Sequence, residues 1–362
     1  MKRFWIASFL ALAFVGCSIG GGFIGSVPQK TGPADSSKVK RAAAEIVSSH
    51  GVATFNISAD TAAGGLPEFV YQGQPGVAPT IRVNPGDTIV VNLTNHLSGT
   101  GMPSDLNLHF HGLGVSPNKP SDDVLTMLAH PGQKLHYVIR VPMTQPPGLY
   151  WYHPHVHGET EYQVGQGGMS GAIVVNGITK RYPQLANMPE QLMIIRSVGG
   201  SPGKDIADHR RRLLALKPDV PCPILYSGYL SVNGQLQTDV TFQPGKPQFF
   251  RILNATGHRT LDLTVRGLSM QIVAIDGYPL DQANGPKTTT VSDFVVAPAG
   301  RIEFVVTPTK KTTLFSRCYN SGPAGDQDPP QVLATLTPQK GASTIARAAG
   351  LLDSPAVPAS SA

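Results

Sequence analysis

Four histidines form two His-x-His pairs, His109 and His111 in NLHFHGLG and His153 and His155 in GLYWYHPHVHGETEY. Side chains two residues apart leave the same face of a strand, so each pair should present two imidazoles side by side. Adjacent imidazoles suit Cu or Zn, and two facing pairs would supply four nitrogen donors. A single pair could be a chance arrangement of surface histidines. Two pairs in glycine- and aromatic-rich segments of one domain favour a metal site.

His157 follows the second pair and has three interpretations: a spare ligand, a hydrogen-bond partner that supports the ligands, or a chance polar residue. We favour support of the ligands, a role for which Trp151 is also a candidate. Trp151 and Tyr152 should wedge their strand into the core, although either could lie on an electron path. Pro154 restricts this segment to a strand end or a sheet edge. The other histidines lack such partners and are interpreted as ordinary exposed or hydrogen-bonded residues: His50, His96, His130, His136, His209 and His258.

Strands must position these histidines, because the composition is that of an all-β protein. Gly (39 residues) and Pro (32 residues) make up about a fifth of the chain, and charged residues are only 14%, against roughly 25% in an average protein. The segment TIRVNPGDTIVVNLTNHL has alternating apolar residues at Ile81 and Val83, then a Pro-Gly turn, then alternation again from Ile89. This pattern predicts a hairpin whose two strands are each buried on one face.

A second copy of this pattern, VTFQPGKPQFFRILNATGH, lies downstream. In both copies the Pro-Gly pair, at 85–86 and 244–245, is followed by an asparagine, Asn95 or Asn254, nine residues after the glycine. The repeat spans a whole domain and predicts two related β-sandwiches in tandem. We place the first at 42–180, with both His-x-His pairs, and the second at 189–338.

The two ends of the chain have different compositions. Residues 1–17 combine a basic start with a short apolar run, as in an export signal peptide, and end in Phe-Val-Gly-Cys, which resembles a lipoprotein cleavage box with Cys17 as the lipidated residue. The chain would then be exported to the periplasm or cell envelope and anchored by lipid alone. Simple cleavage and an uncleaved anchor are the alternatives. Residues 18–41 should form a flexible tether and residues 339–362 a disordered tail.

Two further features bear on partners and redox state. The net charge of +6 is spread thinly and no basic stripe with interleaved aromatics occurs, so no nucleic-acid partner is expected. Cys222 and Cys318 could pair in an oxidising compartment or remain free buried thiols.

The motifs LHFHG and GLYWYHPHVHG, followed by QVGQGGMSGAIVVNG, resemble the first two copper motifs of the multicopper oxidases, the family of laccases and ascorbate oxidase. SVNGQLQTDVTFQPGKPQFFRILNAT, IVAIDGYPL and APAGRIEFVV resemble the middle domain of that family. The resemblance implies two Greek-key cupredoxin domains, bound copper and oxidoreductase chemistry that couples oxidation of a phenolic or metal-ion donor to reduction of O2. It assigns His109 to the type 2 copper, His111 and His153 to one type 3 copper, and His155 to the other.

The chain departs from the family pattern downstream of these motifs. The family's trinuclear cluster uses eight histidines, and its type 1 copper uses a cysteine flanked by histidines. Neither Cys222 nor Cys318 has an adjacent histidine, and the second domain has no His-x-His pair. We therefore expect half of a trinuclear site, no type 1 site and no residue with an assigned catalytic role. No motif of the family's third domain is found in this sequence. A partner that carries that domain, or a homo-oligomer, would have to complete the site.

Three functions fit these residues. The first is an oxidase that is incomplete as an isolated chain. The second is an exported protein that binds or sequesters copper without turnover. The third is an envelope scaffold on an oxidase fold, against which the four intact histidines argue.

Overall fold

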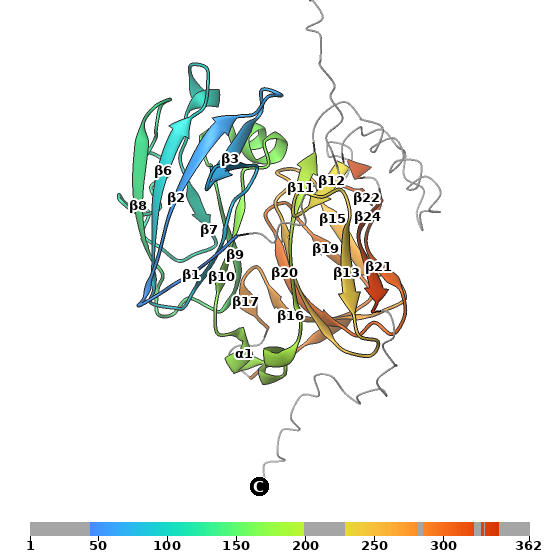
Figure 1. Cartoon of the computed structure of the whole chain (residues 1–362). Helices are drawn as coiled ribbons and strands as arrows, with labels where there is room; N and C mark the ends of the chain where they lie inside the picture. The colour runs from blue at the N-terminus through green and yellow to red at the C-terminus, as the bar shows by residue number, and fades with distance from the viewer. Residues whose placement is uncertain (1–43, 199–228, 281–284, 322–326, 329, 340–362) are drawn as a thin grey trace, which may run out of the picture. The chain divides into compact units, whose positions relative to one another are not determined.

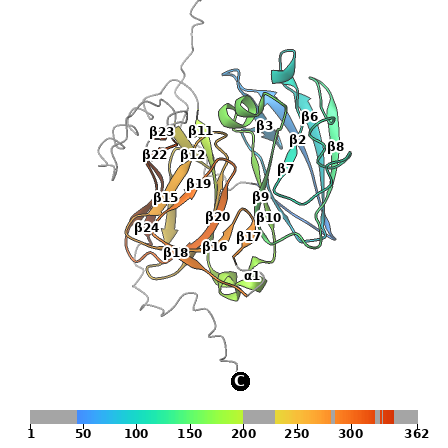
Figure 2. The same ribbon diagram turned by 180° about the vertical axis from the view of Figure 1, so that it is seen from behind.

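The computed structural model describes residues 44–198, 229–280, 285–321, 327–328 and 330–339, all within one compact unit, 42–362. Short strands dominate this part of the chain (Figures 1 and 2). None of its helices has the length and apolar character needed to cross a bilayer. The predicted signal, tether and lipidated Cys17 lie outside the described residues, as do Cys222, His209 and the tail after Gln339.

The first sandwich consists of two five-stranded sheets. One sheet carries His109, His111 and His153, and His155 follows just after one of its strands. Its order is β1 (Glu45–Val47), β5 (Thr80–Val83), β10 (Gly171–Val175), β9 (Gly148–His153) and β7 (His109–His111). The other has the order β4 (Gln74–Pro75), β3 (Pro67–Tyr71), β2 (Val52–Thr61), β6 (Thr88–His96) and β8 (Lys134–Arg140). The inner faces of the two sheets share one apolar core. Short helical turns, η1 (Met102–Ser104) and η2 (Glu161–Gln166), occur in the connections.

The second sandwich repeats this plan. Its larger sheet has the order β12 (Tyr229–Val232), β11 (Glu190–Val198), β14 (Gln248–Asn254), β20 (Arg301–Val306), β16 (Met270–Ile275) and β17 (Tyr278–Pro279), with β18 (Thr289–Val291) also on β16. The facing sheet has the order β13 (Thr238–Phe242), β24 (Gln331–Pro338), β21 (Thr312–Arg317), β15 (Leu261–Val265) and β19 (Phe294–Val296). A small pair, β22 (Tyr319–Asn320) and β23 (Gln327–Asp328), lies apart. The predicted all-β fold of two tandem cupredoxin-like sandwiches is confirmed.

The predicted hairpin is wrong in its pairing. Both strands form where the alternation placed them, and Ile81 and Ile89 are fully buried, but β5 and β6 belong to different sheets of the sandwich. The turn between them, with Gly86 at φ +92°, passes the chain from one sheet to the other. In the second copy, β13 and β14 are divided between sheets in the same way. Period-two alternation identifies the buried face of a strand but not its hydrogen-bonding neighbour, since both sheets bury a face in the same core.

The repeated asparagines have equivalent structural roles. Asn95, at the end of β6, is fully buried and donates from Nδ2 to the carbonyls of Ser104 (2.7 Å) and Ala129 (2.8 Å). Asn254, at the end of β14, is equally buried and donates to the carbonyls of Arg259 and Val296. Each amide connects the end of its strand to carbonyls of neighbouring segments, among them Val296 at the end of β19, which explains why both copies need this residue at the same point.

Between the sandwiches the chain forms α1 (Ile178–Arg181) and η3 (Pro183–Asn187), in the segment where strand periodicity is lost. The domain limits 42–180 and 189–338 stay predictions, with the first sandwich's strands ending at Val175 and the second's beginning at Glu190.

Candidate metal centre

The two histidine motifs lie on adjacent antiparallel strands. In the pairing of β7 with β9, His109 lies opposite His153 and His111 opposite Trp151. The ring centroids of His109 and His153 are 5.4 Å apart, and those of His111 and His153 are 5.7 Å apart. This register places one histidine of each pair directly opposite the other and brings imidazoles from distant parts of the sequence to one point of the sheet.

Three of these histidines offer one nitrogen each within 4.8 Å of the others: His109, His111 and His153. Nε2 of His153 lies 3.4 Å from Nδ1 of His111. Two imidazole nitrogens at this separation can bind a common ion when both are unprotonated, a geometry suited to copper or zinc.

His155 is held differently, because β9 ends at His153 and Pro154 follows. Its ring centroid lies 5.2 Å from that of His109 and 5.9 Å from that of His153. Its Nδ1 is buried without a well-aligned hydrogen-bond partner in the described part of the chain. An unsatisfied buried nitrogen costs about 1–3 kcal/mol, and a metal ion would satisfy it. This buried nitrogen is compatible with a donor set that holds an ion.

Carboxylate and carbonyl groups orient two of the rings. Nδ1 of His109 donates to Oδ2 of Asp122 (2.9 Å), and Oδ1 of Asp122 accepts from the backbone N–H of Phe110 (2.9 Å). Nδ1 of His153 donates to the carbonyl of Pro154 (2.7 Å). With Nδ1 occupied in each ring, Nε2 is the atom left for a metal, the arrangement in which such partners fix the tautomer and raise ligand basicity.

Burial favours the neutral form of His111, His153 and His155. Desolvation, followed by the charge of Arg301 and the neighbouring histidines, lowers the pKa of His111 to about 3. Desolvation also lowers the pKa of His153 well below its ordinary value and, less strongly, that of His155. Neutral imidazole is the form that binds metal, so three donors are competent at neutral pH without losing a proton.

Trp151 and His157, the two predicted supporting residues, differ in placement. Trp151 is 3% exposed and stacks on His153, with ring centroids 4.0 Å apart and planes 28° apart. Its ring lies also 5.1 Å from that of His111. His157 is exposed, with its ring 6.0 Å from that of His155. Trp151 therefore packs directly against two candidate ligands, whereas His157 lies on the outer side of a third. Tyr152 is fully buried in the core, as predicted.

The second sandwich holds the strand that carries His153. The backbone N–H of Leu149 donates to Oε1 of Glu303 (2.8 Å), and its carbonyl accepts from Nε of Arg301 (3.2 Å). Gly148 lies so close to Gly277 that an added Cβ would be 2.5 Å from the Gly277 carbonyl oxygen. Leu149 and Trp151 also share an apolar cluster with residues of β11 and β14. β9 is thus fixed from both sandwiches, which limits its freedom to shift the metal ligands.

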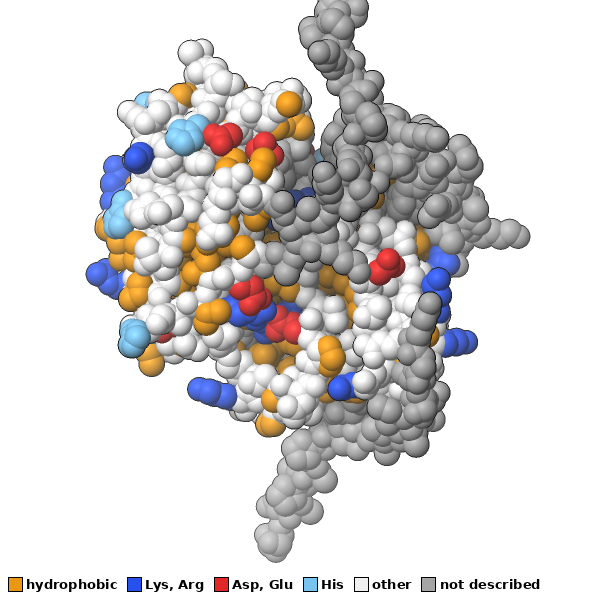
Figure 3. Space-filling view, viewed as in Figure 1, with side chains coloured by type: hydrophobic (Ala, Val, Ile, Leu, Met, Phe, Trp, Pro, Cys, Tyr) orange, Lys and Arg blue, Asp and Glu red, His pale blue; other side chains and the backbone are white. Residues whose placement is uncertain are grey.

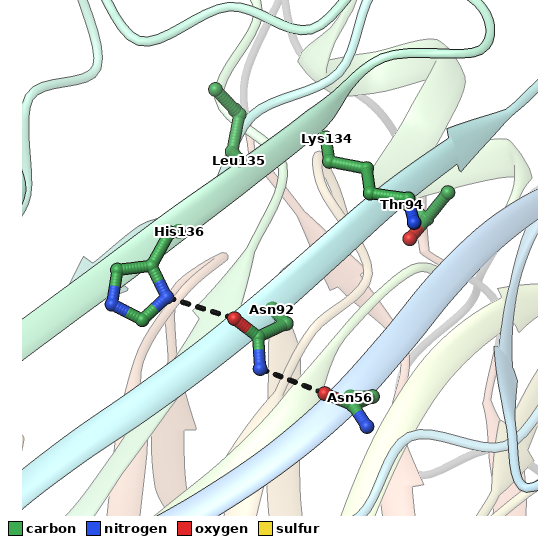
Figure 4. A pocket seen from close by; sticks show the side chains of 6 residues that line it. All are labelled: Asn56, Asn92, Thr94, Lys134, Leu135 and His136. Carbon is green, nitrogen blue, oxygen red and sulfur yellow. Dashed lines mark hydrogen bonds between the residues drawn. The ribbon is translucent and has the colours of Figure 1, made fainter.

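The remaining described histidines lie apart from this cluster, each beside a polar neighbour: His50 with Ser49, His96 with Asp60, His130 with Asp105, His136 with Asn92 and His258 with Glu161. A shallow hollow lies on the sheet of β2, β6 and β8 (Figure 4). Three of the side chains that line it, Asn56, Asn92 and His136, form a hydrogen-bonded row. The hollow belongs to the other sheet of the sandwich and contains none of the four predicted ligands.

Two residues of the site escaped prediction from the sequence. Asp122 orients His109 from thirteen residues away, and Asn107, two residues before the first histidine, contacts the backbone of His155. The signal for Asp122 was its place in an adjacent acidic pair, with Asp123, after the first motif. The signal for Asn107 was a polar residue between two leucines just before the strand. Cys318 is disulfide-bonded and offers no thiolate for a metal, so the alternative of a free buried thiol is wrong for this residue. Cys222, the other cysteine considered for a pairing, lies outside the described residues.

Imidazoles gathered on one edge of a cupredoxin-like sandwich indicate a protein that binds a metal such as copper or zinc, and comparison with known proteins identifies the family. Family models described as multicopper oxidase match residues 66–180 and 151–340. The chain belongs to the multicopper oxidase family. Copper is the cofactor of this family, and the histidine cluster is compatible with it.

The curated relatives include an iron transport multicopper oxidase, fetC, of Epichloe festucae (27% identity over 65% of this chain and 34% of that protein). Another is the multicopper oxidase MmcO of Mycobacterium tuberculosis (26% identity over 67% of this chain and 49% of that protein). The chain therefore spans about a third to a half of these relatives.

Among solved structures, the multicopper oxidase of Campylobacter jejuni, titled a metallo-oxidase, aligns with a TM-score of 0.61 at 22% identity, over 83% of this chain and 61% of that one. McoA of Aquifex aeolicus aligns with a TM-score of 0.60 at 20% identity, over 84% of this chain and 66% of that one. At these identities the structures support the fold alone.

Proposed function

We propose that this chain binds copper through His109, His111, His153 and His155 and supplies half of a trinuclear copper site. The observation that carries the proposal is the convergence of three histidine nitrogens within 4.8 Å, beside the orphaned Nδ1 of His155. In this proposal His109 binds the type 2 copper, His111 and His153 one type 3 copper, and His155 the other.

The residues of this chain would prepare the site rather than react. Asp122 orients His109 so that its Nε2 would be free to bind the ion, and the carbonyl of Pro154 does the same for His153. Trp151 fills the space behind His111 and His153 and excludes water from that side. Copper bound there would supply one-electron redox chemistry, cycling between its cuprous and cupric states.

The activity proposed for the complete assembly is oxidation of a donor coupled to reduction of O2. The remaining histidines and a type 1 copper would come from another domain or subunit. The described residues contain one histidine cluster, and Cys318, the cysteine among them, is disulfide-bonded. The names of the relatives, an iron transport oxidase and a laccase among them, point to metal ions or phenols as donors. By itself the chain should bind copper with little or no turnover.

We also propose export to the periplasm or cell envelope, with Cys17 as a lipid anchor and no other membrane contact. Nucleic acid is not proposed as a partner: on the face shown in Figure 3, Lys and Arg side chains are scattered and acidic side chains lie among them. Such a surface provides no continuous basic track for a phosphate backbone.

Copper titration tests the proposed ligands. We expect the His109→Ala/His155→Ala double variant to lose copper relative to the unmodified chain. His96→Ala/His136→Ala is the matched control, because it removes two histidines of the same sandwich that lie on the other sheet. Equal copper stoichiometry in all three proteins, measured by elemental analysis after gel filtration, would rule out the proposed ligands.

A visible spectrum and an oxidase assay test the missing type 1 site. The purified chain should lack the intense absorption of a copper–thiolate bond, and it should oxidise a phenolic donor slowly or not at all. A strong blue band, or turnover like that of a laccase, would refute the proposed incompleteness. Copper binding without turnover, even when a completing domain is added, would instead favour copper sequestration.

A further inference from the structure

Asn107 is fully buried and makes two side-chain hydrogen bonds that join separate segments of the site. Its Oδ1 accepts from the backbone N–H of His155 (2.7 Å), and its Nδ2 donates to the carbonyl of Val124 (3.1 Å). A buried amide with both ends paired to backbone is a rigid connector, because each bond is expensive to leave unmade away from water.

The backbone of His155 needs such a connector because it lies beyond the strand. The pairing of β7 with β9 ends at His153, and that of β9 with β10 ends at Tyr152. No ladder between the described strands reaches the N–H of His155, and Pro154 before it has no N–H to donate. The Asn107 carboxamide therefore takes the place of the missing ladder bond. It also sits on the approach to β7, two residues before His109.

The other end of Asn107 reaches the segment that orients His109. Val124 is two residues after Asp122, whose carboxylate accepts from Nδ1 of His109. Asn107 thus ties the backbone of His155 to that of Val124. The ring of His109 is oriented by the Asp122 carboxylate, which the backbone N–H of Phe110 holds independently of Asn107. These two rings lie 5.2 Å apart, and His155 is the predicted ligand outside the three-nitrogen cluster.

We propose that Asn107 is a positioning residue that places His155 at its copper, separately from the cluster of His109, His111 and His153. This inference rests on the proposed copper-binding function. In this proposal Asn107 does not touch the metal and acts only by holding the backbone of His155. The effect of Asn107 on copper binding should therefore pass through His155.

A double-variant cycle with Cu(II), titrated against a competing chelator, measures this dependence. Asn107→Ser shortens the side chain so that it cannot span both partners. Loss of a group that orients a metal ligand typically lowers affinity about 10- to 100-fold. We expect a loss of this size for Asn107→Ser at the copper position that His155 serves, which should be the weaker of the two and the later to fill. In a His155→Ala background the same substitution should change copper affinity less than about threefold, because the ligand it places is gone.

Hydrogen exchange of the metal-free protein supplies a readout independent of copper. The His155 amide should exchange faster in Asn107→Ser and stay protected in Asn107→Asp, which keeps an acceptor oxygen of the same reach. Asn254→Ser is the matched control, a buried asparagine of the second sandwich that bonds loop backbone and Thr256. It should lower stability without changing copper affinity.

The outcomes separate the two proposals. If the unmodified chain binds no copper, the proposed function fails and the role of Asn107 with it. If the unmodified chain binds copper and Asn107→Ser binds it equally well, only the role of Asn107 is overturned. That role is also overturned if the loss of affinity persists undiminished in the His155→Ala background, or if Asn254→Ser causes an equal loss.

Discussion

Asp122 and Asp123 are adjacent aspartates with different partners, and they provide a matched pair of substitutions. Oδ2 of Asp122 accepts from Nδ1 of His109 at 2.9 Å, while its Oδ1 holds the backbone N–H of Phe110. Asp123 accepts from the backbone N–H of Thr126 (2.8 Å) and of Leu125. Asp122→Asn keeps an oxygen for Phe110 but replaces the oxygen nearest to His109 with an amide nitrogen. His109 then loses the shorter of its two contacts with Asp122 and keeps only Oδ1, at 3.1 Å, which Phe110 shares, so the hold that reserves its Nε2 for metal is weakened.

The expected size follows from the bond that is lost. A hydrogen bond to a charged group contributes about 1.5–3 kcal/mol. Tenfold in affinity corresponds to about 1.4 kcal/mol, so Asp122→Asn should weaken copper binding roughly 10- to 100-fold, the range known for partners of metal-bound histidines. The carboxylate is only 12% exposed and the imidazole 26% exposed, so solvent screens this pair only partly.

Chelator competition monitored by isothermal titration calorimetry measures this loss. Asp123→Asn should leave copper affinity within about twofold of the unmodified chain, because solvent-exposed substitutions away from the ligands have small effects. If both variants bound copper as tightly as the unmodified chain, the argument that Asp122 orients His109 would be refuted. Equal losses in both would mean that the segment matters only through its general stability.

Three further predictions concern stability and attachment. Glu303→Gln removes the charge facing Arg251 in a buried ion pair (Nε–Oε2 2.8 Å) and should destabilise the protein by about 3 kcal/mol in urea unfolding; a loss below about 0.5 kcal/mol would contradict it. Because the pKa of His111 is about 3 when folded and 6.5 ordinarily, only the unfolded chain is protonated there between these values. Metal-free protein should therefore lose stability as pH falls below about 6.5, by about 2 kcal/mol at pH 5 from this residue, and His111→Gln should flatten the dependence. An unchanged slope would show that His111 is not buried neutral. Cys17→Ala should release the mature protein from the membrane fraction, and continued association would exclude lipidation.

Much of the fold was accessible from local pattern. Alternation placed strands around Ile81 and Ile89 correctly because one face of each is buried in the core. The sheet to which each strand belongs was not accessible, since either sheet of a sandwich can bury the same face. The equivalent roles of Asn95 and Asn254 show why the repeat was informative: both satisfy carbonyls at the same corner of related sandwiches.

The site divides in the same way. His109 and His111 could be paired from spacing, because alternate residues of one strand share a face. The same reasoning fails for the second pair, since β9 ends at His153 and His155 lies beyond the strand. Asp122 and Asn107 could not be found from spacing, since their contacts depend on how loops fold back over the strand ends. Contacts between the two sandwiches, such as the Glu303 carboxylate with the backbone N–H of Leu149, join residues 154 positions apart and leave no local signal.

Anomalous diffraction at the copper edge from copper-loaded crystals tests the central claim most directly. We predict a copper peak bounded by Nδ1 of His111 and Nε2 of His153, which lie 3.4 Å apart in the metal-free geometry, and a second position served by His155. Copper located elsewhere, such as at the hollow of Asn92 and His136, with no density at the histidine cluster, would contradict it.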